Sequence, residues 1–321
     1  MYDEEGDASM SDLIFAMETV LPLLLLMSAG VLCRKTGLLT DALVKGVNQL
    51  IFRVFLPINL FYSVVHTPYD TVLQGKELGI IAGGLLIEFG LLFLTVPHLE
   101  KDRKKIGVMI QGMGRANYAF FGIPLVAMLF PGRDTSLAAL LVPLTVPVYN
   151  VMSVIALTVY GEGKMNVKRI IVNILKNPLI IAPLIGYALW LLRIQPPSVL
   201  DGTLSDLGKI ATPLALFALG GAIRLTSAKA HMRQLLIAVP WRLILAPLIF
   251  VGGAALLGLR EVALACAFVT FGSPTAVSSY PMAQSMGGDG ELAAELVAFS
   301  STLSIVTTFL FVFAMKSLGL I

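Results

Sequence analysis

Charged side chains are scarce in this sequence: Asp, Glu, Lys and Arg together make up 13% of its 321 residues. Soluble globular domains carry about 25%, so the composition excludes an ordinary soluble domain. Cysteine is scarcer still, because only Cys33 and Cys266 occur, and they form neither a disulfide framework nor a metal-ligand motif. The small net charge of +3 favours no nucleic-acid partner. We expect no cofactor, no metal and no enzymatic activity.

Apolar residues dominate instead, at 57% of the chain. They gather in about ten runs, most of which approach the roughly 20 residues that a helix needs to cross a hydrocarbon core. The sequence therefore predicts an all-α membrane protein with ten transmembrane helices. The runs are Leu13–Leu32, Leu50–Val65, Leu78–Pro97, Ile106–Phe130, Leu137–Tyr160, Pro178–Leu192, Leu207–Ile223, Leu235–Leu257, Val262–Ser285 and Leu292–Phe313.

The distribution of basic residues predicts the orientation of these helices. If the N-terminus lies outside the cytoplasm, the inward loops carry fourteen Lys and Arg residues and the outward loops carry five. Cytoplasmic loops hold the excess of positive charge. We therefore expect a multi-pass protein of the cell (inner or plasma) membrane with both termini outside the cytoplasm. Residues 1–12 are acidic and lack the features of a secretory signal, so we expect an extracytoplasmic tail there.

An offset of 156 residues relates the two halves of the chain. It places Pro22 on Pro178 and Pro57 on Pro213, and it places Asn117 on a serine. The pattern predicts two copies of a five-helix unit. Because five is odd, the second copy enters the bilayer from the opposite side, which makes the copies inverted repeats.

This repeat sets the expected division of the chain. The first five-helix repeat spans residues 13–160 and the second spans residues 178–321. A basic cytoplasmic loop at residues 161–177 joins them. The fourth helix of each repeat, which is helix 4 or 9 of the chain, is the one that we expect to be broken.

Two stretches, Gln111–Pro124 and Gly272–Pro281, are rich in Gly, Pro, Asn and Ser within otherwise apolar runs. A lipid-facing helix cannot leave that many backbone groups unpaired, so we expect both breaks to face inward and to meet near the membrane midplane. Half-helix ends carry free N–H groups and a partial positive charge, which favour a bound anion such as a carboxylate. Paired breaks of this kind indicate the substrate site of a transporter.

The candidate substrate-binding residues belong to these two breaks. For the serines, hydrogen bonding to their own helix is the competing interpretation. For the asparagine, the alternative is an interhelical hydrogen bond that holds the break open. The candidates are Asn117, Arg115, Gly122, Pro124, Ser273, Pro274, Ser278 and Pro281.

Four basic residues fall within expected spans, where each needs a partner or a route to water: Arg53, Arg115, Lys209 and Arg242. Arg115 lies beside the first break and is the best placed for substrate charge or gating. Arg53 and Lys209 are gating or charge partners by one interpretation and snorkelling side chains by the favoured one. Glu88 lies in the middle of an expected span. It is either a proton carrier or, by the favoured interpretation, the counter-ion of a basic residue.

The positions of the three histidines do not favour a buried proton relay. His66, His98 and His231 all fall near the ends of expected spans. Glu295 is also expected near the interface, where hydration suffices.

Three motifs stand out in this sequence: Gly122-Ile-Pro-Leu125 after Asn117, Val20-Leu-Pro-Leu23 in the first run, and Asn177-Pro178 at the start of the second half. In these motifs the chain resembles the auxin efflux carrier family of secondary transporters. The resemblance extends over nearly the whole chain.

This resemblance implies ten helices and a crossing of helices 4 and 9 at prolines, which correspond here to Pro124 and Pro281, with Asn117 as a binding residue. Similar proteins carry auxin in plants, and bacterial relatives are associated with malonate or malate. Residues 161–177 are short beside the extended loop of plant carriers, which favours a bacterial malonate- or malate-carrier-like member.

The hypothesis is therefore a secondary transporter that moves a small organic anion, a carboxylate such as malonate, malate or an auxin-like acid, by alternating access. One alternative is a sodium- or proton-coupled symporter of the bile-acid carrier type, and a remote one is a membrane receptor or sensor. The expected partners are the organic anion and the lipid bilayer, and a homodimer is left open.

Overall fold

The structure is a computed structural model, and it describes residues 21–22, 25–66, 75–161, 172, 176–222 and 230–321. The expected acidic tail at 1–12 and most of the loop at 161–177 lie outside these residues. Within them the chain is helical or in turns, with one isolated β-bridge and no strand. The predicted all-α fold is thereby confirmed.

Residues 25–35 form the first described helical segment of any length. The named elements follow in chain order, with η marking π-helical turns. They are α2 (Asp41–Leu50), η1 (Ile51–Phe55), α3 (Leu56–Val65), α4 (Gly75–Leu99), α5 (Arg103–Gly114), η2 (Tyr118–Gly122), α6 (Ile123–Leu129), α7 (Ser136–Leu140), α8 (Val142–Val159), α10 (Pro178–Leu191), α11 (Ser198–Ala222), α12 (Met232–Pro240), η3 (Trp241–Leu245), η4 (Pro247–Val251), α13 (Gly252–Leu256), α14 (Glu261–Gly272), α15 (Ser279–Ser285) and α16 (Gly290–Ser317).

Four continuous helical stretches are long and apolar enough to cross a membrane: Asp41–Val65, Gly75–Leu99, Met232–Leu256 and Gly290–Ser317. Large apolar side chains on them stay exposed, including Leu94 and Leu256. Contiguous apolar surface of this kind is unfavourable in water and suits contact with lipid. The ten-helix inverted-repeat arrangement stays a prediction.

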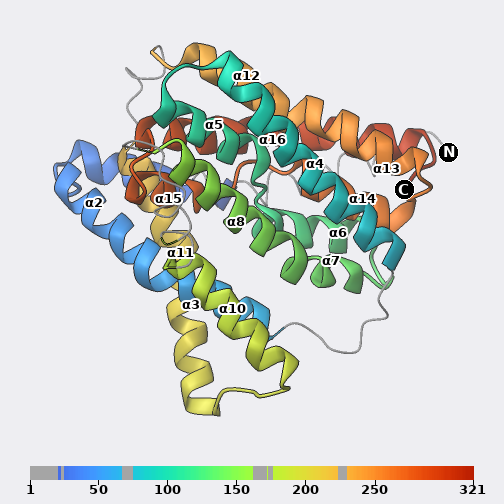
Figure 1. Cartoon of the computed structure of the whole chain (residues 1–321), viewed down its shortest axis with the longest axis horizontal. Coiled ribbons are helices and arrows are strands. Elements are labelled where there is room, and N and C mark those ends of the chain that lie inside the picture. The colour runs from blue at the N-terminus through green and yellow to red at the C-terminus, as the bar shows by residue number, and fades with distance from the viewer. Residues whose placement is uncertain (1–20, 23–24, 67–74, 162–171, 173–175, 223–229) are drawn as a thin grey trace.

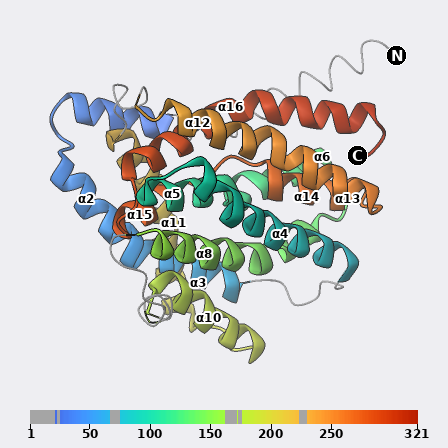
Figure 2. The ribbon, with the colours of Figure 1, turned by 45° about the horizontal axis from the view of Figure 1, so that its top comes forward.

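Helices α2, α3, α10 and α11 group on one side of the molecule, and α4, α5, α8, α12, α14 and α16 make up much of the remainder (Figures 1 and 2). Glycines of α11 let this helix pack closely against the helical segment at 25–35 and against α3. A Cβ atom on Gly220 would lie 1.9 Å from the carbonyl oxygen of Met27, and one on Gly208 would lie 3.2 Å from Cα of Asn59. Small residues permit such backbone contact between membrane helices.

Both predicted interruptions are present. Helix α5 ends at Gly114, and helical structure resumes at Tyr118; α14 ends at Gly272, and α15 begins at Ser279. Arg115 and Ser273, which follow the two ends, both have extended backbone. Their free backbone groups need partners in the protein interior, and those partners define the site.

Candidate functional site

The two interrupted segments pair with each other. Ala116 and Thr275 form an antiparallel β-bridge. The amide of Asn117 donates to the carbonyl of Pro274 at 2.8 Å, and the amide of Ala276 donates to the carbonyl of Arg115 at 3.0 Å. Each break therefore satisfies backbone groups that the other has freed, as a buried chain requires. The expected contact between the breaks is confirmed.

The position of this crossing corrects the one that the family resemblance implied. It lies at Ala116 and Thr275, not at Pro124 and Pro281. Both prolines lie inside helices, Pro124 as the second residue of α6 and Pro281 as the third of α15, whereas a β-bridge needs extended backbone. Pro124 is also exposed, while Pro281 is buried.

Gly122 allows close packing between two helical segments. A Cβ atom there would lie 2.8 Å from Cβ of Val269 on α14. The glycine therefore allows η2 to lie directly against α14. This close approach holds the segment after the first break near the helix that leads into the second.

One buried guanidinium joins both helix ends. Arg242 donates from Nε to the carbonyl of Ser273 and from Nη2 to that of Thr270, each at 2.7 Å, and from Nη1 to that of Met113 at 3.2 Å. These carbonyls stand at the C-terminal ends of α5 and α14, which carry partial negative charge. Glu88 lies 3.6 Å away as the counter-ion, in agreement with one of the two roles predicted for it.

Sequence reasoning named Arg242 as a charge in need of a partner but did not place it at the crossing. Arg242 is distant along the chain from both breaks, so its contacts with them could not be read from the sequence. The sequence indicated only that a basic residue within an apolar span is energetically costly unless it has a polar or charged partner.

Hydroxyl groups complete the crossing. Thr275 Oγ1 donates to the carbonyl of Gly112 at 2.8 Å, and Ser300 Oγ accepts from the amide of Thr275 at 3.1 Å. Ser273 Oγ donates to the carbonyl of Val269 on its own helix at 2.6 Å, which is the alternative left open by the sequence. Among the candidates, Ser273 and Pro274 serve the crossing through their backbone carbonyls, which accept from Arg242 Nε and from the amide of Asn117.

A cavity of about 70 Å³ lies against the crossing. The crossing contributes one set of polar groups, α3 and α11 contribute a second, and α8 contributes a tyrosine. These polar residues are Arg115, Asn117, Ser278, Asn59, Ser63, Thr212 and Tyr149. The structure therefore brings three of the eight candidates into one lined space, while Pro124 and Pro281 do not line it.

Arg115 and Asn117 give this cavity its chemistry. Arg115 is 5% exposed, and its guanidinium donates to Ser278 Oγ at 2.8 Å and contacts Met282 Sδ at 2.9 Å. No carboxylate of the described residues forms an ion pair with it, in contrast to Arg242. Asn117 is 4% exposed, and its Nδ2 has no hydrogen-bond partner among the described residues. The cavity thus offers a buried positive charge and a free amide donor.

The two candidate gating cations lie elsewhere. Arg53 on η1 and Lys209 on α11 are both exposed. Lys209 Nζ lies 3.3 Å from Asp206 Oδ1 near the surface. Neither lines the cavity, so neither contacts a ligand bound there in this conformation.

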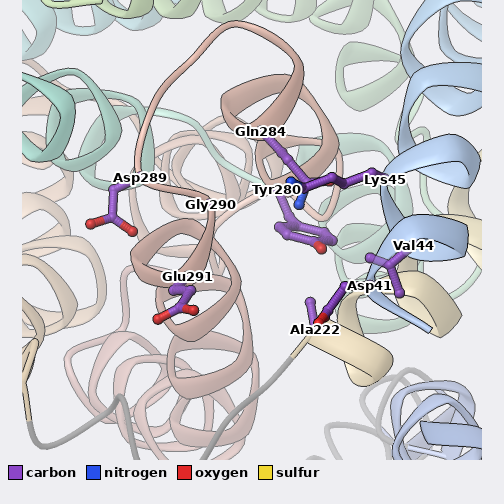
Figure 3. A pocket seen from close by; sticks show the side chains of 9 residues that line it. All are labelled: Asp41, Val44, Lys45, Ala222, Tyr280, Gln284, Asp289, Gly290 and Glu291. Carbon is purple, nitrogen blue, oxygen red and sulfur yellow. The ribbon is translucent and has the colours of Figure 1, made fainter. Parts of the chain in front are cut away.

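A second pocket, of about 350 Å³, lies beyond α15 (Figure 3). Side chains from α2, α15 and the start of α16 line it, among them Lys45, Tyr280 and Glu291. Asn48 of α2 donates from Nδ2 to Gln284 Oε1 of α15 beside this pocket. Because Ser278 and Met282 contact Arg115, α15 and the residue that precedes it lie between the pocket and the cavity.

His231 and Glu295 correct two sequence interpretations. Both are buried, at 6% and 2% exposure, rather than hydrated at an interface. His231 Nδ1 lies 2.9 Å from Glu295 Oε2, and Nε2 lies 3.5 Å from Asp289 Oδ2. The start of α12 packs against α16, and this contact removes both side chains from solvent.

The sequence comparisons relate the chain to transport proteins. The family model described as "Membrane transport protein" matches residues 15–169 and 163–312. A protein of Rhizobium meliloti (strain 1021) named "Putative malonate transporter" is 24% identical over 268 residues, which cover 81% of this chain and 83% of that protein.

Proposed function

Because the chain belongs to the membrane transport protein family, we propose that it carries a small organic anion across the membrane by alternating access, with the anion bound in the cavity at the crossing. One observation supports this most strongly. Arg115 is a buried cation that lines the cavity without a carboxylate partner among the described residues. A buried charge is costly unless it is paired, so a bound anion would supply the missing compensation.

The contrast between two arginines supports the assignment. Arg242 is paired with Glu88, and its N–H groups donate to backbone carbonyls, which is a structural role. Arg115 has a hydroxyl and a thioether as partners, and these leave its charge uncompensated. Asn117 Nδ2 and Ser278 Oγ stand with it as further groups for a carboxylate, since charge-assisted hydrogen bonds are the strong ones.

The size of the cavity favours a short substrate. At about 70 Å³ the cavity is several times larger than the roughly 10–15 Å³ that suffices for one water molecule, and it suits a carboxylate of a few carbon atoms. The relative named as a malonate transporter is consistent with a short dicarboxylate. An indole acid would require a wider conformation.

The crossing also bears on ion coupling. A sodium-coupled symporter of the bile-acid carrier type would use backbone carbonyls at the breaks to hold the cation. Here the guanidinium of Arg242 takes three carbonyls at these helix ends. We propose transport without sodium, with the membrane potential contributing about 2.3 kcal/mol per charge per 100 mV to anion export. Proton coupling is the alternative.

The proposal includes the ten-helix architecture. The repeats at 13–160 and 178–321 would form the inverted pair, in the cell membrane with both termini outside the cytoplasm. Small-residue contacts such as Gly220 against Met27 would hold the non-crossing helices together as a scaffold. A second copy of the chain is a further partner to test.

Reconstitution into proteoliposomes tests the function. A series of mono- and dicarboxylates, malonate included, is offered with and without sodium and a pH gradient, and electrical current and uptake are recorded. We expect a current that depends on a short carboxylate and persists without sodium. The absence of transport for every carboxylate would reject the function, whereas strict sodium dependence would establish the symporter alternative.

A further inference from the structure

Gln111, Asn150 and Ser153 are buried polar side chains outside the cavity for which the described part of the chain supplies no hydrogen-bond partner. Gln111 on α5 and Ser153 on α8 are 0% exposed, and Asn150 on α8 is 1% exposed. The side-chain nitrogen and oxygen of Gln111 and of Asn150 have no hydrogen-bond partner among the described residues. The same holds for the hydroxyl oxygen of Ser153. Buried polar groups are normally satisfied, so these atoms on two neighbouring helices are available to a polar partner such as water or a ligand.

The register of α5 against α8 brings these residues to one level. Near one end, Arg103 Nη2 donates to the carbonyl of Val159 at 2.5 Å, and a Cβ atom on Gly107 would lie 3.0 Å from the carbonyl oxygen of Ala156. Near the other end, residues 115 and 149 line the same cavity. The helices are therefore antiparallel, and this register places Gln111 at the axial level of the turn that carries residues 150 and 153.

Gln111 also has a fixed relation to the proposed anion site. It precedes Arg115 by four residues and follows Gly107 by four, so the three positions share one face of α5 and its immediate continuation. One helical turn is about 5.4 Å. Gln111 does not line the cavity, and it lies on the opposite side of Arg115 from the break at Ala116.

The chemistry of these groups suits a carboxylate. Two side-chain amides and a hydroxyl supply hydrogen-bond donors without a formal charge. Resting on the proposed function, we propose that Gln111, Asn150 and Ser153 form a second carboxylate-binding station, one helical turn from Arg115, which receives the anion when it leaves the cavity. A neutral station binds more weakly than the guanidinium, and weak binding along a route permits onward release.

Separate measurements of binding and transport test the station. Gln111→Met and Asn150→Leu remove the donors with little change of volume, and Met109→Leu is the matched control, because Met109 is a buried apolar residue of the same helix. Malonate binding is measured by thermal shift in detergent, and malonate exchange is measured in proteoliposomes. We expect binding in the cavity within about twofold of wild type and exchange slower by about tenfold or more, since hydrogen bonds to charged groups are strong.

The outcomes separate the station from the proposed function. If the wild type neither binds nor moves any carboxylate, the proposed function fails and the station fails with it. If the wild type transports and both variants match it, the station alone is rejected and the groups hold water only. Loss of binding together with exchange would also reject a separate station.

Thiol labelling gives an independent readout should either variant fail to fold. In a Cys33→Ser background, Ser153→Cys is treated with a membrane-permeant maleimide, with and without malonate. We expect labelling that malonate slows, with Val154→Cys as a control that stays unlabelled because Val154 is buried and apolar. Labelling of Ser153→Cys that malonate does not change would overturn the proposal.

Discussion

The guanidinium of Arg242 lies 3.6 Å from the carboxylate of Glu88, and both side chains are fully buried. The same guanidinium bonds carbonyls at the ends of α5 and α14. The pair is therefore a structural link between the two broken helices. It balances its own charge, whereas Arg115, the cation that we propose binds the ligand, has no carboxylate partner among the described residues.

Arg242→Met should destabilise the protein strongly. The substitution leaves Glu88 as an unpaired buried charge and three carbonyls without a donor, and removing one partner of a buried pair costs about 3–5 kcal/mol. Thermal unfolding in detergent measures the effect, and adding Glu88→Leu should recover part of the loss. A melting temperature equal to that of the wild type would contradict the structural role of the pair.

Arg115→Gln should abolish anion transport without loss of stability. It removes a buried charge that lacks a carboxylate partner, so the fold loses little, while the ligand loses a charge-assisted contact worth at least about tenfold in affinity. Uptake in proteoliposomes and the melting temperature are measured together. Arg133→Gln is the control, because Arg133 is exposed and paired with Glu261. Wild-type uptake by Arg115→Gln would remove Arg115 from the site.

Asn117→Ala should also stop transport in a folded protein. The side-chain Nδ2 has no partner among the described residues, whereas the backbone amide that bonds Pro274 is kept in alanine. Transport is compared with circular dichroism and thermal unfolding of the same preparation. Unfolding of the variant would show that the side chain holds the break open, which is the alternative role.

Protonation of Glu100 should make the protein less stable in acid. Burial would raise the pKa of this carboxyl, but hydrogen bonds from the amides of Asp102 and Lys101 and from Gln234, together with nearby Lys105, outweigh it and lower the pKa below 4.5. A lowered folded-state pKa gives stability that is complete above the unfolded value and is lost as pH falls through the folded value.

Melting temperatures between pH 7 and pH 3 measure this effect. The decline should begin near pH 4.5 and should be shallower in Glu100→Gln, which cannot titrate. Parallel curves for the variant and the wild type would show that Glu100 contributes nothing to the acid dependence.

The interruptions of the helices could be predicted because their causes are local. Glycine, proline and polar residues within an apolar run oppose a continuous lipid-facing helix wherever they occur, and α5 and α14 end where these residues gather. The meeting of the two breaks followed from the repeat. The position of the crossing did not, because it depends on which extended residues, Ala116 and Thr275, come into register.

The burial of single charges could not be predicted from position in the sequence. His231 and Glu295 fall near span ends, yet the packing of α12 against α16 encloses them. Arg242 and Glu88 meet only because η3 and α4 lie beside the crossing. Such contacts join distant segments, and a sequence records only that each charge needs a partner.

The sequence by itself determined that this protein is a helical membrane protein with two inward-facing breaks, because hydropathy and backbone preference act over a single turn or span. The tertiary structure alone decided which polar groups satisfy one another and which do not. That distinction is the basis on which we propose Arg115 and Asn117 as ligand-binding groups, since the role of a buried charge or donor can be inferred only once its neighbours are known.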